Sequence, residues 1–134
     1  MKILVLHGPN LNLLGLRSAK LGTNITLDKV NRALRREVRN SEVELKILQT
    51  HDEAKAVTFL HYNRNKAHGL VFAPGPWYQS GVIIKDTLEI IQLPYVTVHF
   101  EKTDEMILNP LSIIINENPV NSYTEGLKKI IVSL

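Results

Sequence analysis

Polar side chains suited to chemistry on a small molecule lie at the ends of two apolar segments, one near the start of the chain and one near residue 100. His7 ends the first apolar run and Asn10 follows it by three residues, and His99 and Glu101 lie at the end of a later run. An imidazole can exchange protons near neutral pH, and an amide can hydrogen-bond a developing negative charge. These residue types indicate acid–base chemistry on a small molecule, although a histidine at the end of an apolar segment can equally be structural.

A long segment between Gly8 and Gly22 carries two cations. Its length is unusual for a connection in a compact α/β protein, and connections of this length are often functional. Gly15 and Gly22 could act as hinges of a lid that brings Arg17 and Lys20 over a pocket. The two cations imply an anionic ligand, and the alternative is a solvated loop whose basic residues have no role.

Metal and nucleic-acid sites are not expected. His7, His51, Asp52 and Glu53 match no metal-binding spacing, and there is no cysteine. Five cations share one predicted helix face, which is interrupted by acids and contains no aromatic residue: Lys29, Arg32, Arg35, Arg36 and Arg39. A nucleic-acid patch is possible on such a face, but a solvated or inter-subunit surface fits the small net charge of +3 better.

The elements that must position these residues alternate along the chain. Short apolar runs, rich in β-branched and aromatic residues, predict five strands at Lys2 to His7, Val43 to Leu48, Gly69 to Phe72, Tyr95 to Phe100 and Leu111 to Ile115. Helical spacing predicts four helices between and after them: Leu27 to Arg39 with Thr26 as its N-cap, one beginning near Asp52, one from Val82 that Pro94 ends, and one introduced by a Ser122 to Glu125 capping box.

This alternation predicts an α/β protein, a flavodoxin-like three-layer sandwich with a five-stranded parallel sheet. The 134 residues, of which 44% are hydrophobic, suit a single domain spanning 1–134. No apolar run is long enough to span a membrane, and the first apolar run is too short for a signal peptide, so we expect a cytoplasmic protein without membrane contacts. Ligands of such sheets bind at the carboxyl ends of the strands.

Two common ligands of flavodoxin-like sheets are not expected. A phosphate-binding loop offers closely spaced Gly, Ser or Thr, whereas the loop after Gly8 contains Pro9 and five leucines. A receiver domain needs an aspartate after the third strand, where this chain has Ala73 and Pro74. No cofactor is therefore predicted.

The segment from Gly8 to Gly15, which reads GPNLNLLG, together with Arg17 resembles the opening motif of type II 3-dehydroquinate dehydratases. The resemblance continues in order along the chain. It includes QTHDE at 49–53, the Pro74 and Gly75 turn, VTVH at 96–99, and Glu125 with Gly126.

The resemblance implies a trans elimination of water from 3-dehydroquinate through an enolate, which gives 3-dehydroshikimate. It implies catalytic roles for Asn10 at the enolate, Arg17 beside the base, and His99 as general acid. The matching substrate-binding positions are Pro74, Gly75, Gln79, Glu101 and Asp86.

Several matching positions depart from the family pattern. Leu21 stands where the family has its tyrosine base, Ala73 replaces a substrate-reading asparagine, and Thr97 replaces the glutamate that supports the histidine. Gln79 replaces a histidine, and Glu101 stands where a serine receives the substrate carboxylate. These departures predict weak or absent dehydratase activity.

Tyr78 or Lys20 could supply a substitute base, whereas the simpler interpretation of Trp77 and Tyr78 is packing or a subunit contact. The alternative function is a non-catalytic homologue that binds another small anionic ligand or serves as an oligomer subunit. The resemblance also implies a homo-oligomer, a trimer or a dodecamer, in which Asp86 reaches a neighbouring site. The partners expected are thus a small cyclic hydroxy acid, or another small anion, and further copies of the chain.

Overall fold

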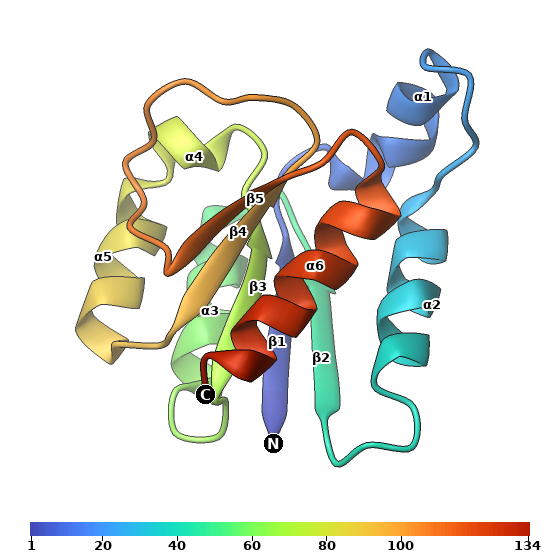
Figure 1. Cartoon of the computed structure of the whole chain (residues 1–134). Helices are drawn as coiled ribbons and strands as arrows, with labels where there is room; N and C mark the ends of the chain where they lie inside the picture. The colour runs from blue at the N-terminus through green and yellow to red at the C-terminus, as the bar shows by residue number, and fades with distance from the viewer.

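A parallel five-stranded sheet forms the middle layer of the protein. The structure, a computed structural model, describes residues 1–134. The strands are β1 (Lys2–His7), β2 (Glu44–Gln49), β3 (Gly69–Ala73), β4 (Tyr95–His99) and β5 (Ser112–Ile115), and their order across the sheet is β2-β1-β3-β4-β5 (Figure 1). This order confirms the flavodoxin-like fold, and the predicted strand ends agree with the observed ones to within one residue.

Helices cover both faces of the sheet. Helices α2 (Leu27–Glu37) and α6 (Pro119–Val132) pack on one face, and α3 (Glu53–Asn63) and α5 (Val82–Ile91) pack on the other (Figure 1). Each central strand serves both layers because successive side chains point to opposite faces. Ile3 and Val5 pack in the core under α2 and α6, whereas Leu4 and Leu6 pack under α3 and α5. No helix is both long and apolar enough to traverse a bilayer.

Polar side chains cap the starts of α2 and α3. Thr26 caps α2 as predicted, since its Oγ1 accepts a hydrogen bond from the Lys29 amide at 3.2 Å. Asp52 caps α3, because one of its carboxylate oxygens accepts from the Ala54 amide at 2.9 Å. A side-chain acceptor at this position satisfies an amide that has no partner inside the helix.

The predicted capping box at Ser122 is wrong. Helix α6 begins one turn earlier, with Asn118 as its N-cap and Pro119 as its first residue. The Asn118 side chain accepts from the Asn121 amide at 3.2 Å. Proline suits the first helical position because the amide N–H that it lacks would have no acceptor inside the helix. Ser122 is buried inside the helix, and its hydroxyl donates to the His99 carbonyl at 2.8 Å.

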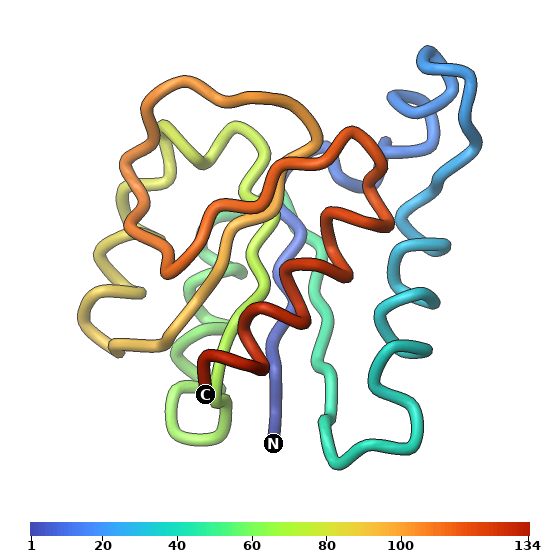
Figure 2. The backbone as a smooth tube through the Cα atoms, in the orientation of Figure 1, coloured from blue at the N-terminus to red at the C-terminus, as the bar shows by residue number.

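Three short helices lie at the carboxyl edge of the sheet. The segment after β1 forms η1 (Leu11–Leu13) and α1 (Leu14–Ala19), and the turn after β3 leads into α4 (Trp77–Ser80). The backbone trace places α1 and α4 on either side of the β4 end (Figure 2). The long connection after β4, between residues 100 and 111, contains no helix or strand. These segments surround the end of the sheet where the predicted site residues lie.

Candidate functional site

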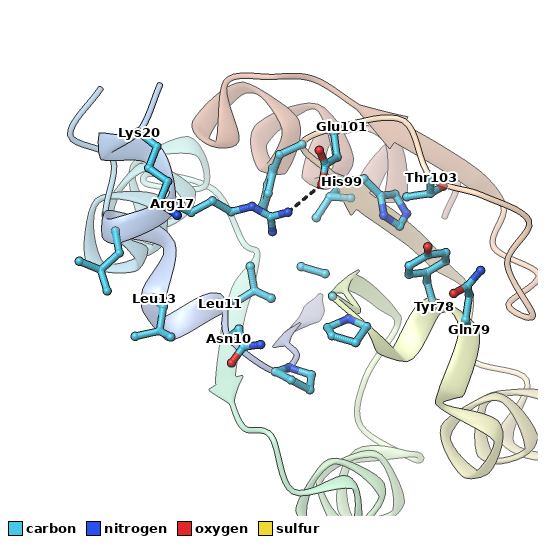
Figure 3. A pocket seen from close by; sticks show the side chains of 17 residues that line it. Asn10, Leu11, Leu13, Arg17, Lys20, Tyr78, Gln79, His99, Glu101 and Thr103 are labelled. Carbon is cyan, nitrogen blue, oxygen red and sulfur yellow. Dashed lines mark hydrogen bonds and ion pairs between the residues drawn. The ribbon is translucent and has the colours of Figure 1, made fainter. Parts of the chain in front are cut away.

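A cleft of about 700 Å³ opens at the carboxyl ends of β1, β3 and β4. Its walls come from the segment after β1, the turn and helix after β3, and the end of β4 with the residues that follow it (Figure 3). Six predicted site residues line it: Asn10, Arg17, Gly75, Gln79, His99 and Glu101. Lys20 and Tyr78, the two candidates for a substitute base, line it as well.

The wall formed after β1 contains Asn10 and Arg17. Asn10 has a left-handed backbone (φ 69°), which asparagine tolerates better than most residues. The Nη2 atom of Arg17 donates to Oε1 of Glu101 at 2.8 Å, so that helix α1 is joined to the residues after β4 (Figure 3). A ligand carboxylate at this position would be repelled by the carboxylate of Glu101. The nearest guanidinium, that of Arg17, is already paired with Glu101.

Ser18 holds the segment after β1 in place, a role that no sequence pattern indicates. It is buried, its hydroxyl donates to the Ile25 carbonyl at 2.8 Å, and the Ile25 amide donates to the same oxygen at 3.0 Å. The Ser18 carbonyl also accepts from the Thr23 amide and hydroxyl. These bonds fix α1 to the connection that leads into α2. Serine residues in polar segments are usually exposed, so the hydrogen bonds of Ser18 to Ile25 could be found only in the structure.

The turn after β3 brings two loops into close contact. Gly75 has a left-handed backbone (φ 54°), and a Cβ atom there would lie 2.8 Å from the Pro9 carbonyl oxygen. Only glycine meets both conditions without strain. Pro74 does not line the cleft, although its carbonyl accepts from the Trp77 amide at 3.1 Å and thereby starts α4.

The two aromatic residues of helix α4 lie in different surroundings. Trp77 is buried in the core under α5, in agreement with the packing interpretation. Tyr78 instead lines the cleft, and its ring lies edge-on to that of His99 with the centroids 6.4 Å apart (Figure 3). The Tyr78 carbonyl accepts from the Ile107 amide at 2.9 Å, which ties α4 to the long connection after β4.

His99 is held at its backbone and left unpaired at its ring. Its carbonyl accepts from the Ser122 hydroxyl at 2.8 Å and from the Asn116 amide at 3.1 Å. Its side chain is buried, and Nε2 has no hydrogen-bond partner. Burial lowers the pKa of His99 from 6.5 to about 4, because the charged imidazolium loses solvation. Two residues earlier, the Thr97 hydroxyl is also buried without a partner, so no carboxylate supports this histidine.

Two predicted positions lie away from the cleft. Leu21, at the position of the family's tyrosine, is 72% exposed and faces a second hollow of about 700 Å³ beyond the Arg17 and Glu101 pair. Asp86 is exposed on α5 and does not line the cleft of its own chain. Neither side chain belongs to the lining of the cleft.

His7 has a structural environment. Its Nε2 donates to the Asn31 Oδ1 atom at 2.8 Å, which leaves Nδ1 to accept from the Tyr123 hydroxyl at 2.6 Å. Both His7 and Tyr123 are fully buried between the sheet and helices α2 and α6. This arrangement needs a neutral imidazole, because a protonated Nδ1 could not accept the tyrosine hydrogen bond.

Acidification is expected to destabilise the protein through His7. Burial lowers its pKa from 6.5 to about 4, so between these values the unfolded chain binds more protons than the folded one. The His7 contribution is fully present above pH 6.5 and is lost as the pH falls toward 4, by about 3 kcal/mol in total. Urea unfolding at pH 7, 5.5 and 4 measures it.

Matched variants separate this effect from general acid denaturation. His7→Gln removes the titrating group, whereas His61→Gln removes an exposed histidine on α3. The free energy of unfolding should fall less steeply with acidity in His7→Gln than in His61→Gln. Equal slopes in the two variants would contradict the assignment.

Comparisons with known proteins agree with the geometry. The sequence profile of the family described as "Dehydroquinase class II" matches residues 1–109. A 3-dehydroquinate dehydratase of Trichodesmium erythraeum is 35% identical over 137 residues, which cover 96% of this chain and 91% of that relative. One of Synechocystis sp. is 38% identical over 98 residues, which cover 73% of this chain and 64% of that relative.

Solved structures share the fold. A type II dehydroquinase of Butyrivibrio crossotus superposes with a TM-score of 0.88 at 20% identity, covering 98% of this chain and 97% of that one. A 3-dehydroquinate dehydratase-like protein of Bifidobacterium longum superposes with a TM-score of 0.74 at 20% identity, covering 97% and 94%. At this level of identity the likeness concerns the arrangement of strands and helices.

Proposed function

This chain belongs to the class II dehydroquinase family, and from that premise we propose that its cleft eliminates water from 3-dehydroquinate, slowly, to give 3-dehydroshikimate. The observation that carries the proposal is the presence of Asn10, Arg17 and His99 in one cleft. They come from the segment after β1 and from the end of β4, which are distant in the sequence. Their groups can hydrogen-bond an enolate, hold an anion and transfer a proton.

The reaction needs a base, and Tyr78 is our candidate. A base removes the proton next to the ketone, the electron pair moves to the ketone oxygen, and the enolate then expels the hydroxyl group as water. Tyr78 can take the carbon-bound proton only if it gives up its own phenolic proton. We assign His99 as the acceptor because its ring lies beside Tyr78 and is neutral at pH 7. The imidazolium so formed then protonates the leaving hydroxyl, which returns His99 to its neutral form.

The Asn10 side chain is our candidate for the enolate. It lines the cleft and makes no side-chain hydrogen bond within the protein. An unengaged amide can therefore donate to the oxygen on which charge develops. The left-handed backbone at Asn10 sets the direction of its Cα–Cβ bond at the edge of the cleft.

Slow turnover follows from the same geometry. Leu21 offers no titrating group and faces away from the cleft, and Glu101 engages Arg17. A missing or displaced general base typically costs about 10²–10⁴-fold in rate. These two features also favour a second candidate function, in which the protein binds a small anion of this class without transforming it.

A turnover assay distinguishes the two functions. The conjugated enone product absorbs in the ultraviolet, whereas 3-dehydroquinate does not carry that chromophore. We expect slow, saturable formation of the enone with folded protein at micromolar concentration. Saturable binding of 3-dehydroquinate without any enone would support the non-catalytic function instead.

We also propose that the protein assembles through helix α5. Val82 and Ile83 are 62% and 60% exposed there, and Asp86 is exposed one turn further along the same helix. Exposed apolar side chains in a cluster are typical of protein interfaces. Light scattering at micromolar concentration is expected to give a trimer or a multiple of it, and Val82→Asp should dissociate it. If the wild-type protein is a monomer, Asp86 cannot contribute to the cleft of a neighbouring copy.

A further inference from the structure

The charged groups of the cleft are two cations and one anion. Arg17, Lys20 and Glu101 line it, and Glu101 is the one acidic side chain that does so. The carboxylate of Glu101 engages Arg17 directly, with 2.8 Å between Oε1 and Nη2 (Figure 3). The free protein therefore already has a carboxylate on one of the two cations that could bind an anion in the cleft.

The Arg17 and Glu101 pair is an exchangeable contact. The two side chains are 59% and 73% exposed, and exposed ion pairs contribute little to stability because water competes for both charges. Helix α1 does not depend on the pair for its position, since Ser18 fixes it separately through hydrogen bonds to Ile25. A ligand carboxylate can thus replace Glu101 on the guanidinium without unfolding the segment.

We propose that Glu101 determines the selectivity of the cleft by competing with the carboxylate of the ligand for Arg17. A carboxylate ligand must displace Glu101 and then lie near its displaced negative charge, and both effects weaken its binding. An uncharged ligand of the same shape meets neither penalty. This inference rests on the proposed function only in taking the ligand to be a small cyclic carboxylate.

Two probes that cannot react test the competition. Quinate has the ring and carboxylate of 3-dehydroquinate but a hydroxyl in place of the ketone, and quinamide is its neutral amide. Titration calorimetry gives Kd for both probes with wild-type protein and with Glu101→Gln. We expect Glu101→Gln to bind quinate about 5- to 10-fold more tightly, and to bind quinamide with unchanged affinity.

A matched variant controls for net charge. Glu105→Gln removes an exposed carboxylate from the same connection after β4, outside the cleft. It is expected to leave Kd for quinate within about 2-fold of the wild-type value, because exposed charges at a distance are screened by salt.

Three results would overturn the inference. They are an unchanged or weaker affinity of Glu101→Gln for quinate, an equal gain for quinate and quinamide, and no binding of quinate to either protein at millimolar concentration. None of these readouts requires turnover. Tighter quinate binding by Glu101→Gln in a protein that forms no enone would support the inference while rejecting the proposed reaction.

Discussion

Replacement of His99 by alanine is expected to lower kcat for 3-dehydroquinate by about 10²–10⁴-fold. The imidazole is the proton carrier that we place between Tyr78 and the leaving hydroxyl, and the cleft lining offers no second imidazole. Nε2 of His99 makes no hydrogen bond within the protein. Replacement of the side chain should therefore leave no other buried polar group without its partner. Enone formation measures the loss, and thermal unfolding shows that the variant is folded.

His51→Ala is the matched control for His99→Ala. His51 follows β2 at the same edge of the sheet, is exposed, and does not line the cleft. Its replacement should leave kcat within about 2-fold of wild type, the usual insensitivity of exposed positions outside a site. Equal activity of the His99→Ala variant and the wild type would reject His99 as the proton carrier.

The pH profile carries the same argument. With a pKa of about 4, His99 is neutral in the free protein at pH 7 and can accept a proton. Protonation below its pKa blocks that step, so kcat/KM should hold steady from pH 7 to about 5 and fall as the pH approaches 4. A fall centred near the ordinary histidine value of 6.5 would contradict the buried, neutral state.

Strand positions could be predicted from the sequence because buried parallel strands are continuous apolar runs. The apolar runs predicted as strands at Lys2 to His7 and at Tyr95 to Phe100 correspond to β1 and β4, and both strands end at the predicted edge of the sheet. Polar residues that follow such runs meet at that edge whatever their separation in the chain. This is why the sequence predicts Asn10 and His99 at one edge of the sheet, where both line the cleft.

Contacts that depend on tertiary packing could not be predicted. Asn118 and Ser122 are both good N-caps, and the choice depends on the bond between Ser122 and the carbonyl of His99. The Arg17 and Glu101 pair joins residues 84 positions apart, and no periodicity indicates it. Local sequence states which caps and charges are available, and packing decides which of them are used.

The same limit applies to the adjacent residues Trp77 and Tyr78. Sequence composition suggests packing for both, since large aromatic side chains are usually buried. In the structure α4 directs Trp77 into the core and Tyr78 into the cleft. Neighbouring helical residues point about 100° apart, so one turn can supply both a core anchor and a site residue.

Tyr78→Phe is expected to lower kcat by about 10²-fold or more while changing KM by less than about 3-fold. The substitution keeps the ring that packs against His99 and removes only the hydroxyl that we assign as the base. A group used in proton transfer affects the transition state, whereas a group that only fills the cleft affects binding. The separation of kcat from KM therefore tests the role and not merely the location of Tyr78.

Tyr62→Phe is the control, because Tyr62 is an exposed tyrosine on α3 that does not line the cleft. Its ring contacts Lys46 and Lys66, which also lie outside the cleft lining. Its kcat should equal that of the wild type. If Tyr78→Phe also keeps full kcat, the base must be another group, and Lys20 is the remaining candidate in the cleft lining. Lys20→Met would then reduce kcat in its place.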